Sequence, residues 1–103
     1  MSEEYTEDLQ KLYLEFLLAD KDLFVRCNAI TNSKYFVRKY QPVMDFIQEH
    51  VDGYGDLPTH EQIKAKVRIE FDDVRDKITD DHKKWFMDEY EKFCRLKRSI
   101  YPN

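Results

Sequence analysis

The chain has 103 residues with 42% hydrophobic content, a length and composition typical of a single domain built around one core. Its two glycines and three prolines are too few for strands joined by tight turns, so the composition favours helices. The 21 acidic and 17 basic residues give a formal net charge of −4, which argues against a protein that binds nucleic acid over its whole surface.

Two helices are predicted in the N-terminal third of the chain. The first spans residues 5–19, where apolar residues recur at intervals of three and four along one helical face. These residues are Leu9, Leu12, Tyr13, Phe16 and Leu17. Asp20 then opens a shorter helix over residues 21–30, and the polar residues 31–33 form a break before the aromatic pair Tyr35-Phe36.

A third helix is expected to start near Gln41, because the next residue is a proline, which suits the first helical turn. Gly53 or Gly55 should end it with a left-handed cap. Thr59 then caps a fourth helix, and Gln62 completes a capping box. The apolar stripe predicts that this helix continues to about residue 78. A break in the helix at residues 72–73 is the alternative. The stripe consists of Ile63, Val67, Phe71, Val74 and Ile78.

The last helix should run from about residue 82 toward residue 101, with Thr79 and the two aspartates after it at its start. Trp85 and Phe86 are expected in the core, because a small bundle needs its largest side chains inside. The other apolar members are Tyr90, Phe93, Leu96 and Ile100. The prediction is an all-α protein, a compact bundle of five or six helices that forms a single interaction domain over residues 1–103.

The sequence does not predict catalysis. The glycines of Gly53-Tyr54-Gly55 lead to no lysine, so they do not form a phosphate-binding loop. The candidate metal ligands are scattered singly rather than in short-spaced pairs. They are Cys27, His50, His60, His82 and Cys94. We therefore expect no enzyme activity, no cofactor and no metal site.

The chain is expected to be an intracellular, cytoplasmic protein. No apolar run approaches the roughly 20 residues that a membrane-spanning helix needs, and the acidic residues 1–4 do not look like a secretory signal. Without such a signal, Cys27 and Cys94 are best interpreted as reduced thiols in the core rather than as a disulfide.

Association with another protein is the preferred function. The last helix carries large apolar residues up to its end, beyond what closing a small bundle requires. The candidate interface consists of Phe93, Leu96 and Ile100, flanked by Arg95 and Arg98. Two alternatives stay open. The helix end could simply close the bundle, or its basic residues could bind nucleic acid, although positive charge is ordinary at a helix C-terminus.

Several segments resemble the N-terminal domain of DnaB-type replicative helicases, particularly those of tailed bacteriophages related to T4. In that family an aromatic Tyr-Phe pair, here Tyr35-Phe36, precedes a helix that ends near a Y-x-x-x-P-[ST] turn. Residues 54–59 match this turn, and Thr59 matches the residue that caps the next helix. Residues 81–98 are similar to the helix leading to the family's helical hairpin, and residues 18–24 to its opening helices. The similarity extends over residues 18–100.

The resemblance implies a helical collar domain that acts in DNA replication. Such a domain associates with its own copies in a hexameric helicase and docks primase or a helicase loader. The last helix would be the first arm of a hairpin, and the ATPase motor would be a separate domain, with both the second arm and the motor outside this sequence. The chain is then either an excised helicase domain or a free-standing adaptor or inhibitor of replication proteins, active in the cytoplasm of a bacterial host.

Overall fold

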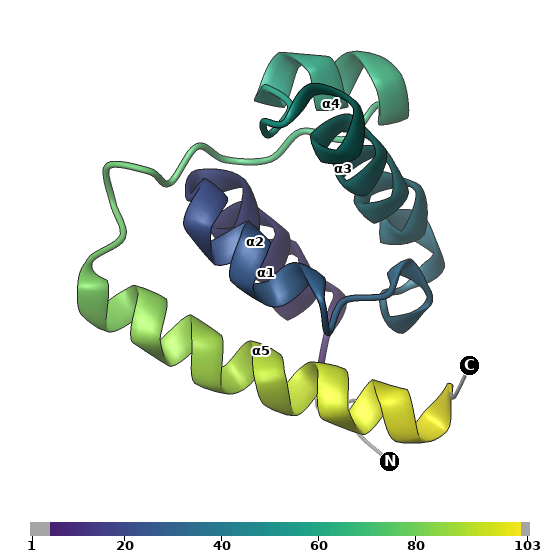
Figure 1. Ribbon diagram of the computed structural model, residues 1–103, viewed down its shortest axis with the longest axis vertical. Helices are drawn as coiled ribbons and strands as arrows, with labels where there is room; N and C mark the ends of the chain where they lie inside the picture. The colour runs from purple at the N-terminus through teal and green to yellow at the C-terminus, as the bar shows by residue number, and fades with distance from the viewer. Residues whose placement is uncertain (1–4, 102–103) are drawn as a thin grey trace.

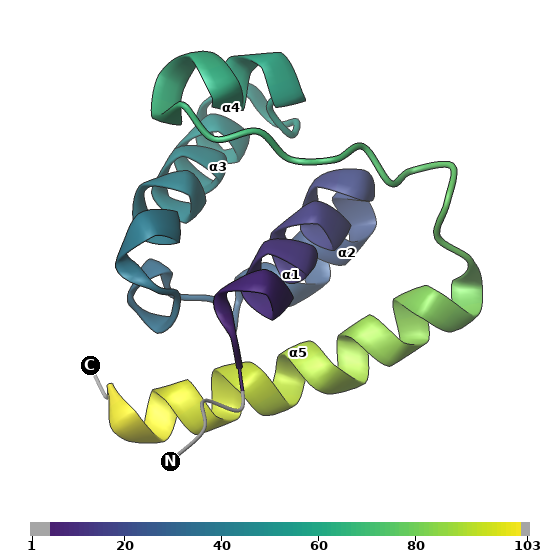
Figure 2. The ribbon, with the colours of Figure 1, turned by 180° about the vertical axis from the view of Figure 1, so that it is seen from behind.

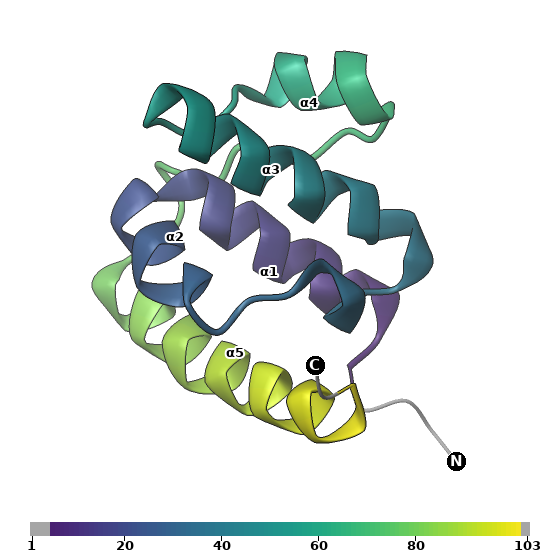
Figure 3. The same ribbon diagram turned by 45° about the vertical axis from the view of Figure 1, so that its right-hand side comes forward.

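The computed structural model describes residues 5–101, so the acidic residues 1–4 noted above and residues 102–103 lie outside the description. Within that range every regular element is helical, which confirms the all-α prediction. The five α-helices and two short 3-10 turns are α1 (Glu7–Ala19), α2 (Lys21–Asn28), η1 (Ser33–Tyr35), η2 (Arg38–Tyr40), α3 (Gln41–Tyr54), α4 (His60–Val67) and α5 (Asp80–Ile100). Figure 3 shows α1 and α2 between α5 on one side and α3 with α4 on the other.

The helix ends follow the capping residues. Asp20 accepts a hydrogen bond from the N–H of Asp22 at 2.9 Å and so caps α2. Thr59 and Thr79 each accept from the N–H three residues later, and both belong to complete capping boxes. Of the two glycines proposed to end α3, the structure uses Gly55, whose φ of 72° is left-handed.

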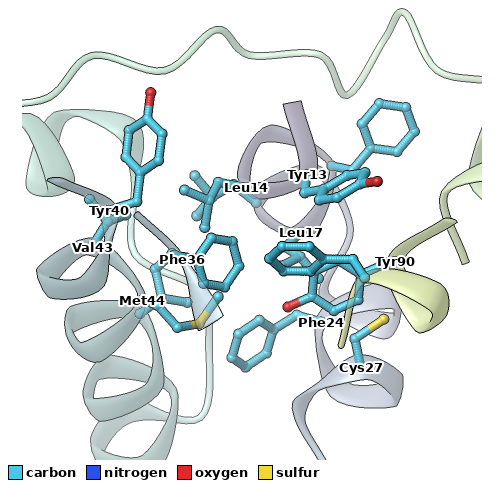
Figure 4. Packing of buried hydrophobic residues seen from close by; sticks show 14 of the residues in the cluster. Tyr13, Leu14, Leu17, Phe24, Cys27, Phe36, Tyr40, Val43, Met44 and Tyr90 are labelled. Atoms are coloured by element: carbon cyan, nitrogen blue, oxygen red, sulfur yellow. The ribbon is translucent and has the colours of Figure 1, made fainter. Parts of the chain in front are cut away.

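The central element is α1, because six consecutive residues of this helix, 13–18, are buried. A helix that is buried all round must have packing partners on every side. Figure 4 shows Leu14 directed toward the side of Tyr40 and Val43, and Tyr13 toward the side of α5 that carries Tyr90. The predicted inward face of this helix is therefore only part of what it buries.

Two buried polar side chains of α1 hold non-helical segments against it. Gln10 accepts a hydrogen bond from the N–H of Val37 at 2.8 Å and donates one to the carbonyl oxygen of Tyr5 at 3.0 Å. The carboxylate of Glu15 accepts the N–H of Asp72 at 2.8 Å. Burying a polar group without a hydrogen-bond partner costs free energy, so these bonds fix where the segments around Val37 and Asp72 cross α1.

The prediction that the fourth helix continues to residue 78 is wrong. The helix α4 ends at Val67, and Arg68 follows with a left-handed φ of 61°. Residues 68–79 then run across the molecule to α5 without forming a helix (Figures 1 and 2). Phe71 is buried beside Tyr40, with ring centroids 6.0 Å apart. The apolar residues of this segment are thus buried by tertiary contacts with its neighbours, and their helical spacing was misleading.

An aromatic cluster joins α5 to α1. The ring of Tyr13 lies 5.8, 5.6 and 5.4 Å from the rings of Phe86, Tyr90 and Phe93, measured between centroids. The prediction that Trp85 is a core residue is wrong, because 43% of it is exposed. It packs edge-on against Phe16, with ring centroids 6.1 Å apart. Successive helical residues point about 100° apart, so Phe86 points into the core while Trp85 contacts α1 only at its edge.

The neighbouring residues Trp85 and Phe86 give a stability test. Phe86→Ala should lower the free energy of unfolding by about 3–5 kcal/mol, because it empties a fully buried position. Trp85→Ala should cost only about 1–2 kcal/mol, since much of the indole already contacts water. Chemical denaturation of both variants measures the difference, and equal losses would contradict the assignment of Trp85 to the surface.

An ion pair connects the start of α2 with α5. The Nζ atom of Lys83 lies 3.0 Å from the carboxylate of Asp20. This hydrogen bond lowers the pKa of Asp20 below its ordinary value of 3.8 and raises the pKa of Lys83. A carboxyl whose folded pKa is lowered stabilises the fold above its unfolded pKa, and this contribution is lost as the pH falls through the folded pKa.

Asp20→Asn keeps a good capping residue but removes the charge. At pH 7 it should unfold slightly more easily than the parent chain, because it loses the attraction between two partly exposed charges. Below the lowered pKa of Asp20 the parent carboxyl is protonated too, so the difference should vanish. Thermal melts at neutral pH and near pH 2 measure this. A difference of the same size at both pH values would contradict the role given to the ion pair.

Candidate protein-interaction surface

The core stops before α5 does. Phe93 is fully buried, with its ring centroid 5.1 Å from that of Tyr5 and 5.3 Å from that of Phe36. Its neighbour Cys94 is also buried, but after it every described residue of the chain except the half-buried Lys97 is exposed. The last six residues of this 21-residue helix, slightly less than two turns, therefore extend past the bundle that residues 80–94 close.

Three exposed apolar side chains lie on one flank of α5. Trp85, Leu96 and Ile100 are 43%, 40% and 53% exposed. They are separated by 11 and 4 residues, which is close to three turns and one turn of a helix with about 3.6 residues per turn. Between them Glu89 and Lys92 form an ion pair with a nitrogen–oxygen distance of 3.5 Å. We call Trp85, Leu96 and Ile100 the α5 apolar stripe.

The predicted interface residues do not all lie on this surface. Phe93 is a core residue and is inaccessible to a partner, so its inclusion in the candidate interface is corrected. It was grouped with Leu96 and Ile100 because the three share a helical spacing, but the bundle covers only the first of them. Arg95 forms an ion pair with Glu91 one turn earlier on the same helix. Arg98 lies on the other flank of α5, beside a groove.

That groove, which we call the α2–α5 groove, has a volume of about 620 Å³ and lies between the end of α2, the loop after it and α5. Its floor includes the buried sulfur-containing residues Cys27 and Cys94 and the half-buried Met87, whose Sδ lies 3.5 Å from the Sγ of Cys27. Its lining also includes the guanidinium groups of Arg26, Arg95 and Arg98. The sequence pattern indicates the last two arginines but neither Arg26 nor the groove, because residues distant in the chain form the groove.

The two cysteines are free and buried, as predicted. Burial raises the pKa of Cys27 to about 11 and that of Cys94 to about 12. Both thiols are therefore protonated at neutral pH, and a protonated thiol is a poor nucleophile and a poor metal ligand. Near them, the hydroxyl of Thr31 donates to the carbonyl oxygen of Cys27 at 2.8 Å and lies 2.7 Å from the hydroxyl oxygen of Tyr90.

No three His, Cys, Asp or Glu side chains of residues 5–101 gather closely enough to hold a metal ion. None of the helices in that range has the length and apolar character needed to cross a lipid bilayer. His82, one of the scattered candidate ligands, instead accepts the N–H of Thr79 at 3.1 Å as part of the capping box of α5.

Comparisons with protein-family models, with curated proteins and with solved structures find no match to this chain. The resemblance to helicase N-terminal domains is therefore carried by the quoted residues alone. The overhanging end of α5, with its apolar stripe, and the α2–α5 groove are the features from which a function can be argued.

Proposed function

We propose that this chain is a non-catalytic protein–protein association domain that binds its partner through the α5 apolar stripe. The observation that carries the proposal is the exposure of Leu96 and Ile100 on a helix whose core contacts end at Phe93 and Cys94. A helix that overhangs its own bundle offers a face that another helix or a groove can cover.

The stripe has the chemistry of a helix-packing surface. Fully burying a leucine or isoleucine contributes about 1.5–3 kcal/mol, and both side chains here are about half exposed, so Leu96 and Ile100 together would contribute about 2–3 kcal/mol. Trp85, farther along the same flank, would extend the contact by three turns. The Glu89–Lys92 ion pair lies between these anchors, where charges influence the orientation of a partner more than its affinity.

A collar domain of a replicative helicase is the specific form of association that the sequence favours. The turn that carries the resemblance is compatible with it, because α3 ends at Gly55 and Thr59 caps α4 with a full capping box. In this role the stripe would hold helicase subunits together, as a homo-oligomer, or dock primase or a loader in the cytoplasm of a bacterial host. A free-standing adaptor or inhibitor of replication proteins would use the same surface.

The absence of catalysis is part of the proposal. Gly55 caps a helix, and the stretch between the glycine pair and α4 carries neither the lysine nor the spacing of a phosphate-binding loop. The two buried thiols are protonated at neutral pH, which argues against their use as nucleophiles. Any ATPase activity would then belong to another domain, and no cofactor is required.

Introducing a negative charge on the stripe tests the proposal. Leu96→Asp and Ile100→Asp should each weaken self-association or primase capture by at least about tenfold, since about 1.4 kcal/mol of apolar contact is lost. Ala65→Asp is the matched control, because it adds the same charge at an exposed position of another helix, α4, away from the stripe. Sedimentation equilibrium and pull-down with primase measure binding, and thermal melting measures folding.

Two results would contradict the proposal. If Leu96→Asp and Ile100→Asp unfold the monomer as severely as Phe86→Ala does, the end of α5 belongs to the core. If the parent chain neither self-associates nor captures primase, or if Ala65→Asp weakens binding as much as the stripe variants, the stripe is not the binding surface.

A further inference from the structure

The charges of the chain are divided unequally along the sequence. Residues 26–44 and residues 92–101 contain eight of the 17 basic residues and none of the 21 acidic ones. The rest of the chain therefore has nine basic residues against all 21 acidic residues. A protein with a net charge of −4 thus has two strongly basic segments, well separated in sequence.

The fold brings these two segments together. The η1 turn contacts α5, and the ring of Phe36 lies 5.3 Å from that of Phe93. The α2–α5 groove lies on one side of this contact, with Arg26, Arg95 and Arg98 in its lining. A second hollow of about 440 Å³ lies on the other side and is lined by both segments as well. Its basic residues are Lys34, Arg38 and Lys97.

Positive charge predominates in the lining of the α2–α5 groove, and Arg26 also lines a neighbouring hollow that contains Asp22 and Asp88. Glu91 is the sole acidic residue in its lining, and Glu91 pairs with Arg95. Arg26 and Arg98 form no ion pair with any residue in the described range. A guanidinium presents a planar fork of donors that matches a carboxylate with two parallel hydrogen bonds. The edge of the groove is therefore suited to carboxylates.

Apolar residues make up part of the lining of the groove, beside the polar residues Thr31 and Asn32. Ala29 and Ile30 line one wall, and Ile30 is 41% exposed. Cys27, Met87 and Cys94 line the floor and present sulfur and carbon atoms rather than charges. Polarizable sulfur-containing side chains adapt to varied apolar groups. A ligand that fills this groove should therefore carry an apolar side chain as well as negative charge.

We propose that the α2–α5 groove binds an acidic amphipathic peptide segment of a partner protein, with an apolar side chain in the groove and flanking carboxylates on Arg26 and Arg98. The groove and the α5 apolar stripe lie on opposite flanks of α5, so this site is separate from the surface given under Proposed function. A short acidic segment meets mainly the local positive charge, which the acidic remainder of the molecule opposes only weakly beyond a Debye length of about 8 Å.

Single-stranded nucleic acid fits the groove less well. Sequence-tolerant binding of single strands relies on exposed aromatic rings on which bases stack. The one aromatic residue in the lining, Tyr35, is buried. The excess of acidic residues over the rest of the chain also repels a long polyanion. A groove with arginines and apolar residues in its lining but no exposed aromatic ring thus favours an acidic peptide over a nucleic acid.

Fluorescence anisotropy with a labelled peptide tests the proposal. The probe is a short peptide with leucines every three or four residues and glutamates between them. The control probe has glutamine in place of each glutamate. The parent chain should bind the glutamate peptide at physiological salt and the glutamine peptide at least tenfold more weakly. The double variant Arg26→Glu/Arg98→Glu should lose at least tenfold in affinity, and Ile30→Ser should lose severalfold.

The double variant Lys66→Glu/Lys77→Glu is the matched control, because it makes the same change in net charge at exposed positions away from the groove. It should alter the affinity for the glutamate peptide less than threefold, and thermal melting should show that all variants fold. An equal loss in both double variants would mean that net charge alone drives binding, and would overturn the proposal. So would failure of the parent chain to bind the peptide, or tighter binding of an oligothymidylate of the same charge at the same salt.

Discussion

The burial of α1 on all sides is the constraint on which the rest of the structure depends. A helix with buried residues on every face needs neighbours all round, and one antiparallel partner cannot supply them. The aromatic residues of α5 cover one side, α2 packs beside it, and η2 and α3 close the far side (Figure 4). Gln10 and Glu15 add direction to this packing, because their hydrogen bonds accept only particular backbone N–H groups.

The difference in length between α1 and α5 gives the molecule its free surface. With 13 residues against 21, the central helix and its neighbours cannot cover α5 to its end. Beyond Phe93 and Cys94 the helix therefore has two separate flanks, one with the apolar side chains of Leu96 and Ile100 and one beside the arginine-edged groove. The exposure of Leu96 and Ile100 follows from this overhang. The groove begins beside Met87 and Cys94 in the packed part of α5 and reaches the overhang at Arg95 and Arg98.

Local signals in the sequence predicted the fold class, four of the five α-helices to within a few residues, and the caps at Thr59 and Thr79, because capping and helical periodicity act over a few residues. They did not predict the end of α4. Phe71 has the spacing of a helical face, but its burial beside Tyr40 and the acceptor that Glu15 offers to Asp72 are tertiary contacts. Within the candidate site, Leu96 and Ile100 were predicted to face a partner, and the structure shows both exposed. The accessibility of Trp85 and Phe93 and the position of Arg26 could not be predicted, because they depend on which neighbours the fold supplies.

Amide hydrogen exchange on the dilute chain would test the account most directly, because its central claim is that the core of α5 ends near Cys94 while the helix continues. The amides of residues 86–94 should exchange slowly, near the rate set by global unfolding, and those of residues 96–100 much faster through local fraying. Raising the concentration or adding the partner should then slow the second group selectively. Equally slow exchange across both groups in the dilute monomer would show that the end of α5 is part of the core, and would contradict the account.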